Sequence, residues 1–285
     1  MKLMSFTHRG RASYGVVEGD HVRDLGAVLG ANAPTLRAFL AGPGKKSAQP
    51  AMAQAPSLAL TEIMFEPVIP DAGKVICIGI NYASHIAETG RPVPEKPMIF
   101  IRYPDSQVGH NRPMLRPPES VMYDFEGELA VIMGETARRV PREQAYDYVA
   151  GYSCYNDGSI RDWQRHTTQF TPGKTFPGTG GFGPWMVTTD EIPDPTRLDI
   201  ETRLNGQVMQ KAPISDLVFD IPALISYCST FTILNPGDVI ITGTTGGVGA
   251  YRNPPVWLKP GDVVEVEVSR IGTLRNPIED EQITS

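Results

Sequence analysis

The chain has 285 residues, a formal net charge of −6 and an isoelectric point near 5.4. An acidic chain lacks the basic surface that binding to nucleic-acid phosphates requires, so we expect no nucleic-acid partner. No uninterrupted apolar run approaches the roughly 20 residues of a membrane span, and the first residues lack the apolar core of a signal peptide. The sequence therefore predicts a soluble, cytoplasmic protein without a membrane partner.

Residues 1–70 are expected to form a small N-terminal α+β domain, separate from residues 71–285. Alternating apolar residues predict three strands followed by a short helix, at Lys2–Thr7, Ser13–Glu18, Asp20–Leu25 and Thr35–Leu40. Pro67 and Pro70 then favour an extended connector, because proline has no N–H to give to a strand ladder. We place the domain boundary near residue 70.

The second part of the chain is predicted to be mainly β. Apolar stretches predict strands at Lys74–Ile80, Met98–Arg102, 123–134, Tyr148–Tyr155, Trp185–Thr188, Leu198–Leu204, Val239–Thr242 and Asp262–Val268. Helices are expected at Asn81–Glu88, Arg142–Tyr148, roughly 160–168 and Leu217–Ser229, the last with Asp216 as its N-cap. The Gly/Pro-rich segment 171–184 is expected to be a loop. Strands outnumber helices without regular βαβ alternation, so the fold class is α+β, mainly β: a mixed roll or barrel with peripheral helices.

Two carboxylates interrupt the apolar pattern of the strand expected at 123–134. Glu126 and Glu128 are two residues apart, so on a strand their side chains project to the same side, roughly 7 Å apart. Buried without a partner, they would repel each other at a cost of several kcal/mol. A divalent cation with hard oxygen ligands, Mg²⁺, Mn²⁺ or Ca²⁺, is the best counter-charge. The alternative is an edge strand whose two glutamates face solvent.

Asp157 follows the next apolar strand and is the first partner for this pair. If the two strands are neighbours, three carboxylates converge and leave cation positions open, as metal catalysis requires. An Asx-turn or a helix N-cap also explains an aspartate at this place.

Arg161, Gln164 and Lys174 bring hydrogen-bond donors close behind Asp157. On a helix Arg161 and Gln164 face the same way. An arginine fork suits a carboxylate, and a lysine ammonium suits an oxyanion. The Lys174 loop lacks the spacing of a phosphate-binding loop, and a solvated surface lysine is its alternative.

His85 and Glu88 are three residues apart on the helix expected at Asn81–Glu88. A carboxylate beside an imidazole orients it and raises its basicity, which makes a general base for water. An ordinary exposed pair has the same spacing. The Gly-rich segment 241–249, directly after an apolar strand, offers backbone N–H groups and threonine hydroxyls to an anion, although a plain tight turn has the same composition.

Taken in order, these segments resemble the fumarylacetoacetate hydrolase family, in particular its shorter bacterial members with three carboxylates. The family pattern is Asn-Tyr-x-x-His-x-x-Glu, then Glu-x-Glu, Asn-Asp-x-Ser-x-Arg-Asp-x-Gln, Gly-Lys and Thr-Gly-Thr-x-x-Gly-Val-Gly. The matching segments are Asn81–Glu88, Glu126–Glu128, Asn156–Gln164, Gly173–Lys174 and Thr242–Gly249.

The resemblance implies a mixed β-roll catalytic domain, a Mg²⁺ or Mn²⁺ ion, a small 2-keto acid substrate and a homodimer. It assigns Glu126, Glu128 and Asp157 as the metal ligands, and His85 and Glu88 as a water-activating pair on a mobile lid. The other predicted site residues are Lys174 and Gln164 in catalysis and Arg161, Thr244 and Tyr82 in substrate binding.

Three features depart from the family pattern. Ile78 stands where fumarylacetoacetase itself has an additional ligand aspartate. Thr245 stands where proline is usual, and Lys174 is followed by Thr-Phe-Pro-Gly instead of a Ser-Phe-Asp-like run. The last two concern the pocket rim, so they bear on the identity of the substrate more than on the class of reaction.

We hypothesise a metal-dependent hydrolase that cleaves a C–C bond in an acylpyruvate or related 2,4-dioxo acid, giving pyruvate and a carboxylic acid. Arg161 or Thr244 would hold the carboxylate, Lys174 and Gln164 would stabilise the distal oxyanion, and Glu88 through His85 would activate water. The alternatives on the same site are decarboxylation of an oxaloacetate-like acid and isomerisation or hydration of an unsaturated 2-keto diacid from aromatic catabolism. A non-catalytic, metal-stabilised protein that binds a small acid is a further alternative.

Overall fold

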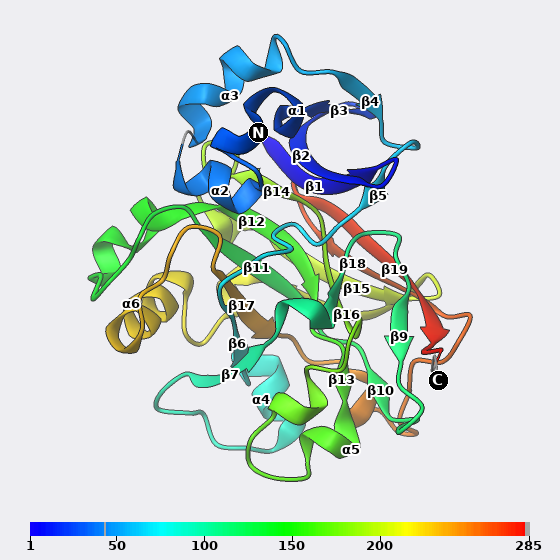
Figure 1. Ribbon diagram of the computed structural model, residues 1–285. Helices are drawn as coiled ribbons and strands as arrows, with labels where there is room; N and C mark the ends of the chain where they lie inside the picture. The colour runs from blue at the N-terminus through cyan, green and yellow to red at the C-terminus, as the bar shows by residue number, and fades with distance from the viewer. Residues whose placement is uncertain (43, 283–285) are drawn as a thin grey trace.

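The computed structural model describes residues 1–42 and 44–282, and most of its strands belong to one long mixed sheet (Figure 1). The strand order is β4-β3-β2-β1-β14-β12-β11-β17-β6-β7, with β5 paired to β1 and β8 paired to β14. These strands are β1 (Lys2–His8), β2 (Arg11–Glu18), β3 (His21–Asp24), β4 (Ser57–Ala59), β5 (Met64–Phe65), β6 (Val75–Gly79), β7 (Met98–Arg102), β8 (Gln107–Val108), β11 (Gly127–Met133), β12 (Val149–Asn156), β14 (Gly180–Thr188) and β17 (Val239–Thr244).

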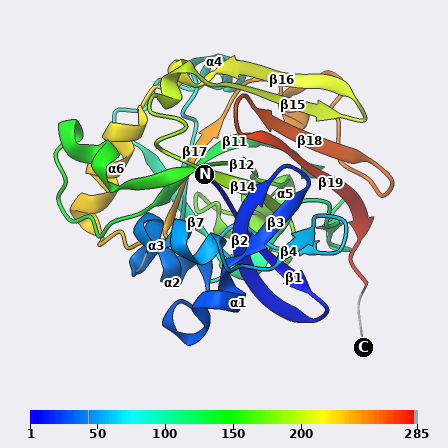
Figure 2. The same ribbon diagram turned by 90° about the horizontal axis from the view of Figure 1, so that it is seen from above.

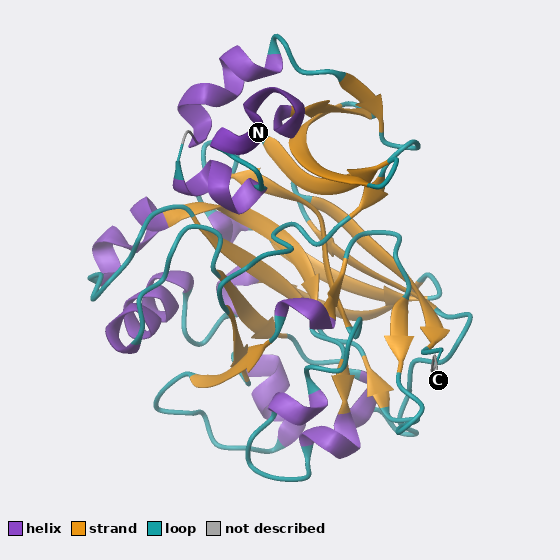
Figure 3. Ribbon diagram, in the orientation of Figure 1, coloured by secondary structure: helices purple, strands orange, loops and turns teal. Residues whose placement is uncertain are grey.

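A second sheet and a short strand pair complete the β structure. The second sheet has the order β16 (Gln207–Pro213), β15 (Asp199–Leu204), β18 (Val263–Val268), β19 (Gly272–Asp280) and β9 (Met114–Arg116), and the pair is β10 (Tyr123–Asp124) with β13 (Ser159–Ile160). The α-helices are α1 (Leu25–Leu29), α2 (Leu36–Ala41), α3 (Gly44–Met52), α4 (Ala83–Thr89), α5 (Arg161–Gln164) and α6 (Ile221–Phe231). Figure 3 shows the strands at the centre and the helices around them, which confirms the mainly β, mixed fold class. Within the described residues no helix is long and apolar enough to cross a membrane.

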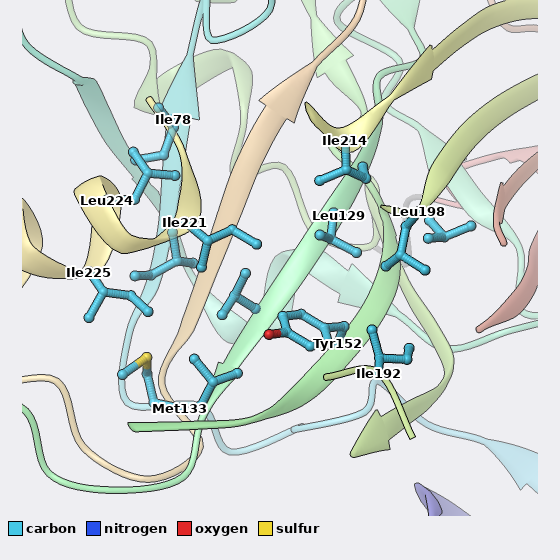
Figure 4. Close-up of a cluster of buried hydrophobic side chains, with 14 of the residues drawn as sticks. Ile78, Leu129, Met133, Tyr152, Ile192, Leu198, Ile214, Ile221, Leu224 and Ile225 are labelled. Carbon is cyan, nitrogen blue, oxygen red and sulfur yellow. The ribbon is translucent and has the colours of Figure 1, made fainter. Parts of the chain in front are cut away.

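Strand β11 lies at the centre of the long sheet, with β12 on one edge and β17 on the other. Because successive side chains of a strand point to opposite faces, its apolar run serves two cores. Leu129 and Met133 pack with Ile221 and Leu224 of α6 on one face (Figure 4). The alternate residues, Ala130 and Ile132, pack on the other face, in the core that contains the N-terminal helices. The continuous burial of β11 follows from this double role.

The N-terminal residues share both sheet and core with the rest of the chain. β1 pairs with β14 through Leu3 and Met186, and Phe39 of α2 belongs to the same buried cluster as Val239 of β17. Figures 1 and 2 show the N-terminal strands and helices, in blue, as one group at one end of the molecule. The division into two domains near residue 70 stays a prediction.

Helix α6 begins at Ile221, and its N-cap is Asp220, whose side chain accepts the Ala223 N–H at 2.8 Å. The expected start at Leu217 with Asp216 as the cap is therefore wrong. Pro222 explains the difference. Proline suits the first turn of a helix, but in a helix begun at 217 it would remove a hydrogen bond and clash with the carbonyl four residues earlier.

Two expectations around Lys174 are also wrong. The helix expected over 160–168 is only the short α5, because the Thr167 hydroxyl accepts the Gln169 N–H at 3.0 Å and so competes with helical bonding. The loop expected over 171–184 ends where β14 begins, at Gly180. Glycine serves packing here, since a Cβ at this position would lie 2.7 Å from a guanidinium nitrogen of Arg102.

His110 is enclosed between the N-terminal group and β19. Its ring packs edge-on against Phe65, with ring centroids 4.8 Å apart, and its Nδ1 accepts the Arg275 N–H at 3.1 Å. Burial, and secondarily the charge of Arg275, lower the pKa of His110 from 6.5 to about 4.

This shift predicts how the stability of the protein depends on pH. Between pH 6.5 and about 4 the unfolded chain binds a proton at His110 and the folded chain does not, so stability falls as the pH is lowered through this window. We expect the urea midpoint to fall between about pH 7 and pH 5, and to fall less in His110→Asn. The exposed His21 provides the control variant His21→Asn. Equal slopes for wild type and His110→Asn would contradict this account.

Candidate active site

A cavity of about 400 Å³ is lined by the ends of β6, β11 and β17 and by the short helices α4 and α5. Figure 1 shows these two helices together at one end of the long sheet. The cavity wall holds most of the polar residues singled out in the sequence: His85, Glu126, Glu128, Arg161, Gln164, Lys174 and Thr244. Apolar side chains of Met98, Phe100 and Phe170 complete it. A cavity of this size and mixed polarity suits a small organic acid.

Three buried carboxylates converge at the inner end of the cavity. Glu126, Glu128 and Asp157 each offer an oxygen, and these oxygens lie within 4.8 Å of one another. The expected strand over 123–134 is interrupted, so only Glu128 belongs to β11, and Glu126 lies in the break after β10. Backbone contacts replace strand alternation in setting the geometry: the Asp157 N–H donates to the Glu126 carbonyl at 2.8 Å, and the Asn156 side chain accepts the Glu126 N–H at 3.0 Å.

Three buried cations surround the carboxylate cluster. Lys174 Nζ lies 2.6 Å from both Glu126 and Asp157. Arg102 contacts the other oxygen of Asp157 at 2.6 Å, and Arg161 contacts the other oxygen of Glu126 at 2.6 Å. Both oxygens of Glu126 and of Asp157 are therefore ion-paired.

The charges act differently on the two glutamates. Burial alone would raise the pKa of Glu126, but Arg161 and Lys174 outweigh it and hold this pKa below its usual range. Burial also raises the pKa of Glu128, and the nearby Asp157 and Glu126 raise it further. Glu128 receives the Gly243 N–H at 2.5 Å, and among the described residues it has no ion-pair partner.

A divalent cation fits this arrangement. Oxygens on opposite sides of Mg²⁺ are about 4 Å apart, close to the spread of the three carboxylates. Glu128 is a buried carboxylate that forms no ion pair within the described chain, and a cation would supply one. Three hard oxygen donors suit Mg²⁺ or Mn²⁺, with Glu126, Glu128 and Asp157 as the ligands.

Helix α4 carries the expected base. His85 Nδ1 lies 3.0 Å from Glu88, and the second oxygen of Glu88 accepts the Gly247 N–H at 2.9 Å. The Ser84 hydroxyl likewise accepts the Gly246 N–H at 3.1 Å. The Gly-rich segment thus binds the side chains of α4, and its backbone N–H groups hold the helix over the cavity.

The structure places the remaining predicted residues in different settings. The Gln164 carbonyl oxygen accepts from Arg161 at 3.0 Å, which leaves its amide nitrogen for the cavity. The Thr244 hydroxyl donates to the Gly127 carbonyl and accepts from Gln210, at 3.0 and 2.7 Å. Tyr82 is fully buried and is not among the described residues of the cavity wall, so its contact with substrate stays a prediction.

Sequence reasoning missed three residues that support the site. Arg102 is the last residue of an apolar strand, and a basic residue at such a strand end was the available signal. Asp124 binds Arg161 at 2.7 Å and also accepts the N–H groups of Gly249 and Ala250. Gln210, on the second sheet, joins Thr244 to the Gly127 N–H, and no local pattern marked it.

The family model described as fumarylacetoacetate (FAA) hydrolase, C-terminal, matches residues 74–279. The chain belongs to the fumarylacetoacetate hydrolase family. It is 43% identical over 223 residues to a mitochondrial oxaloacetate tautomerase of Xenopus laevis, a match that covers 78% of this chain and 70% of the relative.

Solved structures of the fumarylacetoacetate hydrolase family are similar over almost the whole chain. A fumarylacetoacetate hydrolase from psychrophilic Exiguobacterium antarcticum has a TM-score of 0.87 and 35% identity, over 99% of this chain and 100% of that chain. A maleylpyruvate hydrolase from Sphingobium sp. SYK-6, in complex with manganese(II) and pyruvate, has a TM-score of 0.82 and 28% identity, over 99% and 100%. The family and the fold expected from the sequence are confirmed, and the relatives named here are an oxaloacetate tautomerase, a fumarylacetoacetate hydrolase and a maleylpyruvate hydrolase.

The opposite settings of Glu126 and Glu128 predict opposite effects of the same substitution. Glu126→Gln removes one of the two buried carboxylates that pair with each of Arg161 and Lys174, so in EDTA we expect it to lower the free energy of unfolding by about 3 kcal/mol. Glu128→Gln relieves repulsion among buried carboxylates, so in EDTA we expect a gain of about 1 kcal/mol. Both variants should lose the stabilisation that Mg²⁺ or Mn²⁺ gives the wild type. Urea unfolding with and without metal measures both effects, and equal destabilisation in EDTA would contradict the assignment.

Proposed function

We propose that this protein is a metal-dependent enzyme that enolises a 2-oxo acid, in the manner of a keto–enol tautomerase. One observation carries the proposal: the strong cations of the cavity's inner end are committed to carboxylates, while His85 is free to move a proton. Lys174 gives two of its three N–H bonds to Glu126 and Asp157, and Arg161 is shared by Asp124, Glu126 and Gln164. Enolisation requires a base and a counter-charge for one oxygen, and it needs no second set of donors.

Glu126, Glu128 and Asp157 would hold the divalent cation, which when bound supplies positive charge that stabilises the oxygen of an enolate. The neighbouring ion pairs fix the orientation of Glu126 and Asp157, as outer partners of metal ligands do.

His85 performs the proton transfer in this proposal. Glu88 accepts a hydrogen bond from Nδ1, which keeps the proton on that nitrogen and leaves the lone pair on Nε2. Nε2 can then take a proton from the carbon next to the keto group and return it to that carbon or to the oxygen. The Gly247 N–H fixes Glu88, so the imidazole keeps its orientation during the transfer.

Hydrolysis of a C–C bond is the second candidate, and it is favoured by the free amide nitrogen of Gln164 at the cavity wall. In this reaction the His85–Glu88 pair would activate water, and Gln164 with the third N–H of Lys174 would stabilise the oxyanion on the distal carbonyl. The maleylpyruvate hydrolase with bound manganese and pyruvate supports this candidate, but it is only 28% identical to this chain. The oxaloacetate tautomerase, which supports enolisation, is 43% identical. Decarboxylation and isomerisation would begin from the same enolate. A non-catalytic binding protein would have no need of the His85–Glu88 pair.

The test is a parallel assay of three reactions with Mg²⁺, with Mn²⁺ and with EDTA. We expect metal-dependent loss of the enol absorbance of oxaloacetate to exceed both pyruvate release from acetylpyruvate and CO₂ release from oxaloacetate. His85→Ala should slow the tautomerisation about 100-fold or more, because a positioned base contributes that much. The control His21→Ala should not slow it.

Each contrary result has a distinct meaning. If pyruvate release from acetylpyruvate is the faster reaction, the protein is a hydrolase and the tautomerase proposal is wrong. Full activity of His85→Ala would show that His85 is not the base. If no 2-oxo acid is turned over in a metal-dependent reaction, the proposal that the protein is an enzyme is wrong. The homodimer and the cytoplasmic location stay predictions, which light scattering and cell fractionation would check.

A further inference from the structure

Two arginines of the cavity wall have no acidic partner within the described chain. Arg91 directly follows Gly90, which caps α4, and Arg165 is the C-cap of α5. Both line the cavity that holds the carboxylate cluster. The other strongly basic side chains of this wall, Arg161 and Lys174, are held in ion pairs.

Other exposed arginines, such as Arg197, also have no ion pair among the described residues, so what distinguishes Arg91 and Arg165 is that both line one cavity. The two guanidinium groups come from different segments, one next to the lid helix α4 and one after α5. Each presents a planar fork of donors that matches a carboxylate. An anion that enters the cavity would therefore find two strong donors on its outer wall.

The charge balance of the inner end shows what remains for these arginines to bind. Four buried carboxylates, Asp124, Glu126, Glu128 and Asp157, face three buried cations, Arg102, Arg161 and Lys174. A divalent cation would turn this deficit of one positive charge into a surplus of one. One carboxylate of a 2-oxo acid satisfies that surplus, so the inner end has no positive charge left for a second carboxylate.

We propose that Arg91 and Arg165 form a subsite for the distal carboxylate of the substrate, which makes this enzyme selective for 2-oxo diacids over 2-oxo monoacids. The proposal rests on the proposed function, since it places the 2-oxo group at the carboxylate cluster. It identifies the class of substrate and assigns the residues that select it.

The position of Arg91 also links the distal carboxylate to the base. Arg91 is at the C-terminal end of the helix that carries His85, and Ser84 and Glu88 already tie this helix to the N–H groups of Gly246 and Gly247. A carboxylate bound by Arg91 adds another point of attachment. A diacid therefore holds α4, and with it His85, more firmly over the cavity than a monoacid does.

The test compares two ligands that differ only in the distal group. 2-Oxoglutarate and 2-oxopentanoate share one carbon skeleton, with a terminal carboxylate in the first and a methyl group in the second. Isothermal titration of the Mn²⁺-loaded protein should give a dissociation constant about 10-fold to 100-fold lower for the diacid, the range expected for one or two charged hydrogen bonds. Arg91→Gln and Arg165→Gln should each reduce this ratio at least threefold, and the double variant should bring it close to one.

Matched variants separate recognition from general charge. Arg197→Gln removes the same charge at an exposed position outside the cavity and should keep the full ratio. Arg91→Lys keeps the charge without the fork and should give an intermediate ratio.

Equal affinity of the wild type for the two ligands, or an unchanged ratio in the double variant, would overturn the subsite. Either result leaves the proposed function standing if the enol assay shows metal-dependent turnover. The proposed function fails separately, if the protein binds Mn²⁺ but turns over no 2-oxo acid.

Discussion

The structure depends on a buried cluster of alternating charges. Burying an ionised carboxylate costs desolvation free energy, and this cost is offset only where a cation and further hydrogen bonds contact the carboxylate. Lys174 satisfies this condition for two carboxylates at once, since its ammonium bridges Glu126 and Asp157. Arg102 and Arg161 complete the pairs from β7 and α5. The long sheet brings these distant segments to one point, and the large apolar cores on both of its faces hold them there.

This cluster divides the work of the site between a fixed and a weakly held part. The carboxylates and their cations are buried and held in a network of ion pairs, so they form a rigid floor of the site. The acid–base pair is on α4, whose bonds to the Gly-rich segment are two backbone N–H groups received by Ser84 and Glu88. Elements with few bonds open at low free energy. In the proposed reaction this helix would bring His85 to the substrate, while the ion-paired carboxylates keep their positions.

The sequence was sufficient for the carboxylates and insufficient for their partners. Glu126, Glu128 and His85–Glu88 were predictable because their spacing is local, and local spacing survives even where the expected strand is broken between β10 and β11. The link from Arg102 to Asp157 spans 55 positions and has no local signature. Gly180 was predicted to lie in a loop for a related reason. Its requirement for glycine comes from a guanidinium nitrogen of Arg102, which the tertiary structure places 2.7 Å from where a Cβ would be. Pro222, by contrast, was a local signal of the start of α6 that the sequence analysis overlooked.

Ile78 connects the charge of the cluster to the choice of substrate. It lines the cavity at the end of β6 and is almost fully buried, and it stands where fumarylacetoacetase itself is expected to have a further acidic ligand. An aspartate there would add a negative charge to the four carboxylates and cancel the positive charge that a divalent cation leaves over. With isoleucine the surplus of one positive charge remains, and in the proposed arrangement it binds one substrate carboxylate while Arg91 and Arg165 bind the second. The apolar residue at 78 and the unpaired arginines at the rim therefore act together in the proposed binding of a dianionic substrate.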